Sequence, residues 1–324
     1  MTAPLPAELD PADTFVYSIP MRTRFRGIDV REGLLLRGPA GWGEFSPFPE
    51  YPPAVAAHWL AAAREAAGLG WPAGVRDSIP VNVTVPAVGA EQAAAIVAAS
   101  GGCRTAKVKV AEVGQDLAED IARVEAVRAA IGPDGRVRID VNGRWSVDEA
   151  VAAITALAGF DLEYVEQPCA SLEEMALLRR RVDVPLAADE SVRTAQDPLR
   201  VAGLEAADIV VLKVQPLGGV RRALAVAEAC GLPVVVSSAL ETSVGIAAGL
   251  ALAAALPALP YACGLATVAL LGADVVADPL VAVGGEIGVR RPTVDPAALA
   301  QLAASPARRE WWLKRLTSAA AAPP

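Results

Sequence analysis

TAKVKVAEVGQDLAEDIARVEAVRAAIGPDGRVRIDVN, residues 105–142, has the pattern of one complete strand–helix–strand unit. The runs TAKVKV and VRIDVN are short and β-prone, and between them apolar residues recur at steps of three and four from Leu117 to Ile131. This spacing predicts an amphipathic helix, which ends at GPDG, residues 132–135. Strands that are joined by a single helix pair in parallel, so the stretch predicts a repeating βα architecture.

The same alternation continues toward the C-terminus. Further apolar runs are LEYVEQP (162–168), PLAADES (185–191), DIVVLKV (208–214) and PVVVSSAL (233–240). Ser146 with Glu149, and Ser171 with Glu174, have the spacing of capping boxes at helix starts. Six such units in succession favour a closed β/α barrel over an open sheet. No Gly-x-Gly-x-x-Gly follows the first strand, which weakens a dinucleotide-binding interpretation.

The first hundred residues do not share this alternation. TFVYSIPM (14–21) and REGLLLRG (31–38) are typical of antiparallel strands, and AVAAHWLAAAREAAG (54–68) is an Ala-rich helix. We expect a separate α+β unit over residues 1–100 and the barrel over residues 101–284.

The composition, 53% hydrophobic and 20% charged, is that of a globular protein. A formal net charge of −8 argues against a nucleic-acid partner. MTAPLPAELDPADT, at the N-terminus, has neither the cationic start nor the apolar core of a secretory signal. The four cysteines lie far apart, which predicts reduced thiols in a cytoplasmic protein. No self-complementary patch is evident in the sequence, so the oligomeric state is left open.

One long segment, between Glu241 and Asp274, carries no charge and is long enough to cross a bilayer. However, it is mostly Ala and Gly, contains Pro257 and Pro260, and has no flanking cluster of Lys or Arg. The segment therefore predicts a buried helix followed by a buried strand, and no membrane span.

Polar side chains interrupt the apolar strands close to their C-terminal ends. They are Lys107, Lys109, Arg138, Asp140, Asn142, Glu166, Asp189, Glu190, Lys213, Ser237 and Ser238. In a β/α barrel these ends converge on one mouth, where active sites are built.

The acids Asp140, Glu166 and Asp189 come from three consecutive strands. Three carboxylates aimed at one point repel each other unless a cation holds them, and oxygen ligands favour a hard ion such as Mg²⁺, with Mn²⁺ as a substitute. Alternatively, each acid caps the helix that follows it. Zinc is disfavoured because the single histidine, His58, lies outside the predicted barrel, as an ordinary helix residue, and the cysteines do not cluster.

The lysines allow two interpretations. Lys107 and Lys109 share one face of their strand, so they either protect a sheet edge or face the mouth. A lysine near other cations loses its proton more easily and can act as a base. With Lys213 across the mouth, we expect proton abstraction α to a carboxylate, giving an enediolate that the ion stabilises. Lys109 is then the base and Lys107 a helper cation.

These motifs resemble those of the enolase superfamily, in particular its muconate-lactonizing subgroup. The resemblance rests on GWGEFSP (41–47), KVK (107–109), DVN (140–142), EQP (166–168), ADES (188–191) and LKVQPLGG (212–219), and covers nearly the whole chain. It implies a TIM-like (β/α)7β barrel with an N-terminal α+β capping domain, which part of segment 285–324 joins. It also implies that Asp140, Glu166 and Asp189 hold Mg²⁺, that Lys109 is the acid/base and that Lys213 serves the opposite face. Because the barrel has no histidine, branches with a histidine base are disfavoured.

Within the subgroup, RIDVNGRW (138–145), EQPC (166–169), SSALETSVGI (237–246) and YACGLATVALL (261–271) are most similar to a branch that acts in menaquinone biosynthesis. Its reaction is a syn dehydration of a cyclohexadiene carboxylate that bears a succinyl chain and a hydroxyl group. The resemblance implies that Lys109 removes the proton and returns it to the departing hydroxyl, while Lys213 stays protonated. Arg138, Asn142 and Glu190 would orient the ligands, and Ser237, Ser238 and Gly264 would hold substrate carboxylates. Arg24, in the arginine-rich loop PMRTRFRG (20–27), would either meet the succinyl carboxylate or stay in solvent.

Three other functions compete with this one. A dipeptide epimerase or N-acylamino acid racemase of the same subgroup would use the same two lysines on opposite faces. A Schiff-base aldolase would use Lys213 and would not need three aligned carboxylates. A non-catalytic barrel would be favoured by the loss of a ligand or lysine, and none is missing.

Overall fold

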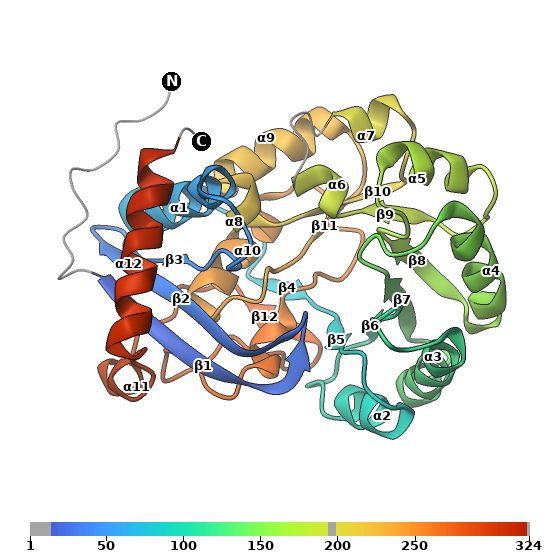
Figure 1. Ribbon diagram of the computed structural model, residues 1–324, viewed down its shortest axis with the longest axis horizontal. Helices are drawn as coiled ribbons and strands as arrows, with labels where there is room; N and C mark the ends of the chain where they lie inside the picture. Colours follow the sequence, from blue (N-terminus) through green and yellow to red (C-terminus); the bar gives the residue numbers. More distant parts are fainter. Residues whose placement is uncertain (1–13, 194–198, 323–324) are drawn as a thin grey trace.

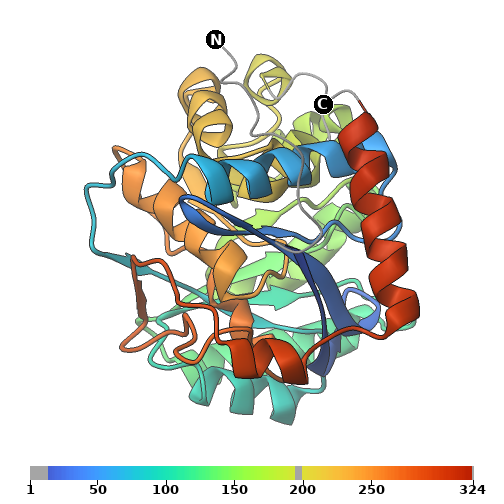
Figure 2. The ribbon, with the colours of Figure 1, turned by 90° about the vertical axis from the view of Figure 1, so that its left-hand side faces the viewer.

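The computed structural model describes residues 14–193 and 199–322. An antiparallel sheet forms one side of the molecule, in the order β1 (Thr14–Phe25), β2 (Ile28–Gly38) and β3 (Gly41–Phe45). Helices α1 (Pro53–Gly68) and α12 (Pro306–Ala321) pack against it, the first in light blue and the second in red (Figure 1). Figure 2 shows both helices across the long β1–β2 ribbon.

The rest of the molecule is built on a curved parallel sheet whose neighbouring strands follow chain order. Its strands are β5 (Val83–Val85), β6 (Thr105–Lys109), β7 (Arg136–Asp140), β8 (Leu162–Glu166), β9 (Leu186–Ala188), β10 (Ile209–Leu212) and β11 (Val234–Val236). Two parallel bridges, Val81 with Cys263 and Ser237 with Gly264, join its edges through one short segment. Seven strands closed by an eighth segment confirm the predicted TIM-like (β/α)7β barrel.

The helices between the strands cover the outside of the barrel (Figure 1). They are α2 (Ala90–Ala98), α3 (Leu117–Ile131), α4 (Val147–Leu157), α5 (Leu172–Arg179), α6 (Glu190–Arg193), α7 (Arg200–Gly203), α8 (Val214–Leu217), α9 (Val220–Cys230) and α10 (Ser243–Ala255). The predicted capping boxes at Ser146 and Ser171 are both present. Each serine hydroxyl accepts from the backbone N–H of the glutamate three residues later, and the side chain of that glutamate accepts from the backbone N–H of the serine.

Two elements before residue 100, β5 and α2, belong to the barrel, since β5 pairs in parallel with β6. The strand that carries Lys107 and Lys109 is therefore the second of the barrel, and Lys213 follows the sixth. From the C-terminal segment, β12 (Glu286–Gly288) pairs with β4 (Ser78–Pro80), and α11 (Pro296–Gln301) and α12 follow. Trp312 of α12 is buried against Phe45, with ring centroids 6.1 Å apart. The boundaries of the two domains stay a prediction.

The charge-free segment forms the buried helix α10, the closing segment at Cys263–Gly264 and a short 3₁₀ turn at Ala266–Leu270. All but the last residue of α10 are buried, as predicted. Across residues 14–193 and 199–322, no helix is long and apolar enough to cross a membrane.

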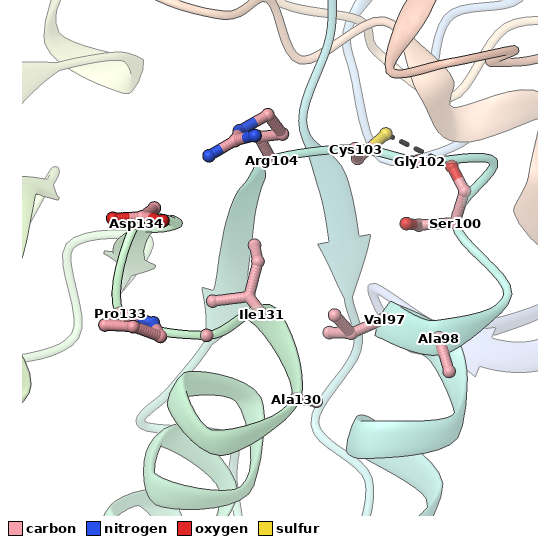
Figure 3. A pocket seen from close by; sticks show the side chains of 11 residues that line it. Val97, Ala98, Ser100, Gly102, Cys103, Arg104, Ala130, Ile131, Pro133 and Asp134 are labelled. Atoms are coloured by element: carbon pink, nitrogen blue, oxygen red, sulfur yellow. Dashed lines mark hydrogen bonds between the residues drawn. The ribbon is translucent and has the colours of Figure 1, made fainter.

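A surface pocket lies between α2 and α3, where β6 begins (Figure 3). Its lining includes Val97, Cys103, Ile131 and Asp134, and the Cys103 thiol donates to Ser100 O at 3.2 Å. None of the predicted site residues lines it, because they lie at the opposite, C-terminal ends of the strands.

Candidate active site

The register of three neighbouring strands brings the predicted lysines and acids together. Lys109 lies beside Asp140, and Asp140 lies beside Glu166, in consecutive parallel pairs. Side chains alternate along β6, so Lys107 and Lys109 share one face while Val108 is buried on the other. Because β6 lies between β5 and β7, the lysines do not protect a sheet edge.

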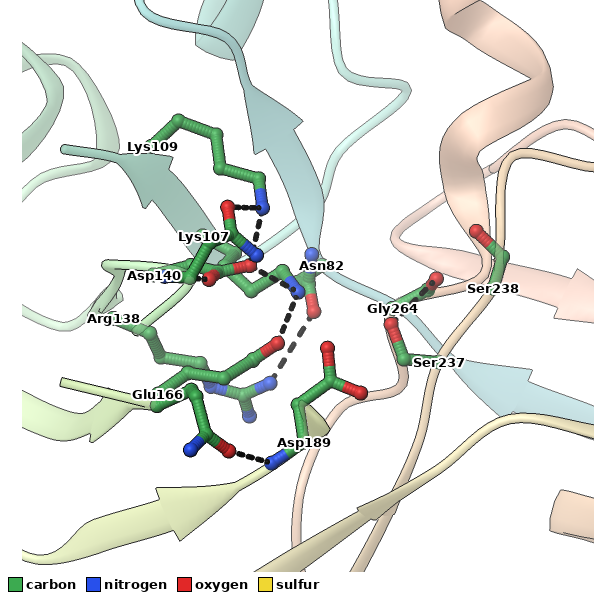
Figure 4. Close-up of polar contacts among 12 residues, drawn as sticks. Asn82, Lys107, Lys109, Arg138, Asp140, Glu166, Asp189, Ser237, Ser238 and Gly264 are labelled. Atoms are coloured by element: carbon green, nitrogen blue, oxygen red, sulfur yellow. Dashed lines mark hydrogen bonds and ion pairs between the residues drawn. The ribbon is translucent and has the colours of Figure 1, made fainter. Parts of the chain in front are cut away.

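The lysines contact the carboxylates directly (Figure 4). Lys109 Nζ lies 2.6 Å from Asp140 Oδ2, and Lys107 Nζ lies 3.1 Å from the same oxygen and 2.9 Å from Glu166 Oε1. Across the mouth, Lys213 Nζ lies 2.5 Å from Asp189 Oδ2. Three ammonium groups and three carboxylates thus form one cluster, in which both Asp189 and Glu166 have no exposed surface.

Burial and neighbouring charge shift the pKa values of the two lysines of β6 in opposite directions. Burial alone would lower the pKa of Lys107, but the charges of Glu166 and Asp140 raise that pKa well above its ordinary value. Burial lowers the pKa of Lys109, and the charge of Lys107 lowers it further, against the opposing effect of Asp140. Lys109 is therefore the lysine that releases its proton more easily.

Burial and neighbouring charge also shift the pKa values of Glu166 and Asp140, in opposite directions. Burial raises the pKa of Glu166 to about 7, and the nearby charge of Asp140 adds to the rise. Burial would also raise the pKa of Asp140, but the adjacent Lys109 and Lys107 bring it below its ordinary value.

Helix capping does not explain Asp140 and Glu166, since Ser146 and Ser171 cap the helices that follow β7 and β8. Their carboxylate oxygens, with those of Asp189, are the donors that a hard divalent ion prefers. Glu166 Oε2 is buried with no hydrogen-bond partner among the residues that the structure describes. The described part of the chain holds no group of three acidic, His or Cys side chains arranged to bind a metal, and lysine ammonium groups contact all three acids.

Two of the residues predicted to orient the ligands form a chain of hydrogen bonds. Asn142 Oδ1 accepts from Lys109 Nζ at 2.7 Å, and Asn142 Nδ2 donates to Glu190 Oε1 at 3.1 Å. Arg138 lies deeper in the barrel, where Nε donates to Glu163 at 2.5 Å and the guanidinium carbon lies 4.6 Å from the centre of the Tyr164 ring. Asn142 thus touches the proposed base directly, whereas Arg138 supports the floor of the site.

Gln167 and Phe25 also contact residues of the site, although the strand-end motifs did not indicate either of them. Gln167 Oε1 accepts from the backbone N–H of Asp189 at 2.9 Å and of Ser191 at 3.2 Å, which fixes the start of the Asp189 loop. The Phe25 ring centre lies 5.5 Å from Lys109 Nζ, so the end of β1 reaches the mouth of the barrel. Both residues lie inside stretches singled out for other residues: EQP for its acid and PMRTRFRG for its arginines.

Ser237 and Gly264 lie across the mouth from Lys109 and Asp140 (Figure 4), and Ser237 Oγ is 3.5 Å from Gly264 O. Ser238 Oγ lies 2.6 Å from Thr267 Oγ1. Arg24 does not join them: its side chain is 69% exposed and its Nη1 lies 3.7 Å from Asp29 Oδ2. The structure therefore places the two serines and Gly264 at the mouth and leaves Arg24 outside.

Comparison with known proteins agrees with this architecture. Residues 89–293 match the family model described as enolase C-terminal domain-like, and residues 16–67 match the one described as enolase N-terminal domain-like. A muconate lactonizing enzyme from Pseudomonas fluorescens superposes with a TM-score of 0.76 at 22% identity, over 90% of this chain and 98% of that chain. These matches define an enolase-superfamily protein, with a barrel and a capping domain.

Two relatives show which family within the superfamily this chain belongs to. An o-succinylbenzoate synthase of Thermobifida fusca (strain YX) is 68% identical over 94% of this chain and 95% of its own length. One of Mycolicibacterium smegmatis is 58% identical over 93% of each chain. The chain belongs to the o-succinylbenzoate synthase family, the branch that the strand-end motifs predicted, and its activity is that of a lyase.

Proposed function

We propose that this chain dehydrates 2-succinyl-6-hydroxy-2,4-cyclohexadiene-1-carboxylate to o-succinylbenzoate. The observation that carries the proposal is the 68% identity to a relative of that activity over 94% of the chain. The same relationship disfavours the epimerase and racemase alternatives, and it overturns the aldolase and the non-catalytic barrel.

The residues at the mouth suit a syn elimination. Lys109 Nζ would take the proton from the carbon next to the ring carboxylate, leaving an enediolate. The C–O bond to the hydroxyl then breaks, Lys109 returns its proton to the departing oxygen, and water leaves as the ring becomes aromatic. The lowered pKa of Lys109 favours its role as the base, and Asn142 Oδ1, at 2.7 Å, orients the amine.

The other two lysines stay charged in this mechanism. Lys213, held at 2.5 Å by Asp189, would stabilise the negative charge of the enediolate from the opposite face. Lys107 sits between Asp140 and Glu166, and its raised pKa keeps it a cation that lowers the pKa of Lys109. One base on one face is sufficient for an elimination in which the proton and the hydroxyl leave from the same side.

We also infer that Asp140, Glu166 and Asp189 hold Mg²⁺, with Mn²⁺ as a substitute. The all-carboxylate donor set and the unpartnered, buried Glu166 Oε2 support this assignment within the described residues. With Lys109 neutral as the base, two ammonium groups and three carboxylates remain, so a divalent cation would make the mouth net positive for a substrate with two carboxylates. When bound, the ion supplies positive charge next to the enediolate.

The test is a spectroscopic assay of the purified protein with Mg²⁺ and the substrate. We expect rapid loss of diene absorbance with formation of o-succinylbenzoate, and loss of this activity in the presence of a chelator. If folded, metal-loaded protein does not convert the substrate, the proposal fails and the epimerases become the better candidates. The cytoplasmic location and the place in menaquinone biosynthesis stay predictions from the sequence.

A further inference from the structure

A buried arginine from the antiparallel sheet reaches the turn that follows barrel strand β11. Arg31, on β2, is 1% exposed. Its Nε donates to Leu240 O at 2.7 Å, and its Nη2 donates to Ala239 O at 3.2 Å and to Ser46 O at 2.6 Å. One guanidinium thus joins β2, the segment after β3 and the turn after β11.

The turn that Arg31 holds is strained. Leu240 has φ +66°, a left-handed conformation in which a bulky side chain is a genuine outlier. Such a conformation persists where surrounding contacts enforce it. Here Arg31 binds the Ala239 and Leu240 carbonyls, one before and one after the Leu240 Cα, and Glu241 Oε2 accepts from Ala239 N at 2.7 Å.

The turn carries the two serines at the mouth. Ser237 and Ser238 begin it, directly after β11. Ser238 Oγ accepts from Leu240 N at 3.4 Å and lies 2.6 Å from Thr267 Oγ1, so the position of the hydroxyl depends on the conformation at Leu240. A change at Leu240 would therefore move the Ser238 hydroxyl at the mouth of the barrel.

A second contact fixes the far end of the same turn. Glu44, on β3, accepts from the backbone N–H groups of Thr242 and Gly245, both at 3.1 Å, where α10 begins. Tyr17 OH also donates to Glu44, at 2.7 Å. Side chains of the antiparallel sheet thus hold the turn at Ala239 and Leu240, through Arg31, and the start of α10 that follows it, through Glu44.

We propose that Arg31 is a positioning residue for the reaction: it fixes the Ser237–Glu241 turn through the Ala239 and Leu240 carbonyls, and so sets substrate affinity from the capping domain. The Nε, Nη1 and Nη2 groups of Arg31 all donate to backbone carbonyls, so Arg31 acts only through the turn. The inference rests on the proposed function, because it takes the substrate carboxylates to bind at Ser237 and Ser238.

The kinetic test compares Arg31→Met and Arg31→Lys with the wild type. Methionine has similar length but no donors, so the two turn carbonyls lose their partner, whereas lysine keeps the charge without the planar fork. We expect KM to rise at least about tenfold in Arg31→Met while kcat changes less than about threefold, because a binding contact is lost rather than a contact of the transition state alone. Arg31→Lys should lie between Arg31→Met and the wild type.

Arg128→Met is the matched control. Arg128 also donates to several backbone carbonyls, including Asp161 O at 3.1 Å, and Asp161 also has a left-handed φ, +52°. Arg128 belongs to α3, and its side chain reaches the residue before β8, at the other end of the barrel. The control should leave KM unchanged. An equal rise in KM in both variants would mean general destabilisation and would overturn the proposal.

A measurement without turnover completes the test. Amide hydrogen exchange of residues 237–245 should be faster in Arg31→Met than in the wild type, and unchanged exchange would also refute the proposal. Exchange needs no substrate, so it decides the role of Arg31 even if the dehydration assay fails.

Discussion

Glu241 makes the stability of this protein depend on pH in a direction opposite to that of most carboxylates. It is 3% exposed, and burial raises its pKa from 4.5 to about 7. Glu44, from β3, raises the pKa further, whereas Arg31, from β2, and the N–H groups of Ala239 and Glu241 itself lower it. The folded protein therefore binds a proton at Glu241 that the unfolded chain releases at lower pH.

The sign and size of the effect follow from this difference. A carboxyl with a raised pKa stabilises the fold fully below about pH 4.5, loses that contribution as the pH rises to about 7, and changes nothing above. At about 1.4 kcal/mol per pKa unit, the loss amounts to about 3 kcal/mol. Glu241→Gln carries no charge at any pH and keeps an oxygen that can accept from Ala239 N. Relative to the wild type, the variant should gain about 3 kcal/mol of unfolding free energy across this window.

The measurement is urea unfolding at several pH values between 4.5 and 8, followed by tryptophan fluorescence, for the wild type and Glu241→Gln. Glu125→Gln, which removes an exposed carboxylate on α3, controls for the change in net charge. If the curves of unfolding free energy against pH for wild type and Glu241→Gln ran parallel, Glu241 would not hold a proton in the folded state, and the reasoning would be refuted.

Three further predictions concern the site and the core. Lys109→Ala should lower kcat by at least about 10²-fold because the base is lost, while the circular dichroism spectrum stays that of the wild type; near-normal turnover would show that another group is the base. Asp189→Asn should weaken Mg²⁺ binding measured by titration calorimetry, because one charged ligand is lost, and unchanged affinity would remove Asp189 from the proposed ligand set. Trp312→Ala should cost about 3–5 kcal/mol of unfolding free energy, because a ring that is 1% exposed packs on Phe45; a cost below about 1 kcal/mol would contradict that packing.

The sequence predicted the barrel and the strand-end cluster for one physical reason. A parallel strand is buried on both faces, so each polar residue inside it stands out against an apolar background. Lys109, Asp140 and Glu166 are visible for that reason, and the register of β6, β7 and β8 then places them side by side. The same pattern missed β5, because a strand of three residues gives too little alternation to separate it from a loop.

Residues that act through backbone groups leave no such signal. In the sequence, Arg31 stands between Val30 and Glu32 with nothing to mark it, and its function depends on carbonyls more than 200 positions later in the chain. Gln167 is likewise recognisable only once the backbone of Asp189 has been placed next to its amide. Which carbonyl or N–H a side chain meets is decided by tertiary packing, so these residues could not be predicted from composition or periodicity.

The two lysines of β6 show how far side-chain chemistry can be predicted from the sequence. They are two positions apart and share a face, yet their pKa values move in opposite directions. Lys107 meets two carboxylates, at 2.9 and 3.1 Å, whereas Lys109 meets one carboxylate, an uncharged amide and the positive charge of Lys107. The difference comes from Glu166, whose Oε1 lies 2.9 Å from Lys107 Nζ although the strand register aligns Glu166 with Asp140 and Lys109. The different roles of a fixed cation and a base therefore depend on how the side chains meet at the mouth, and they exist only in the folded barrel.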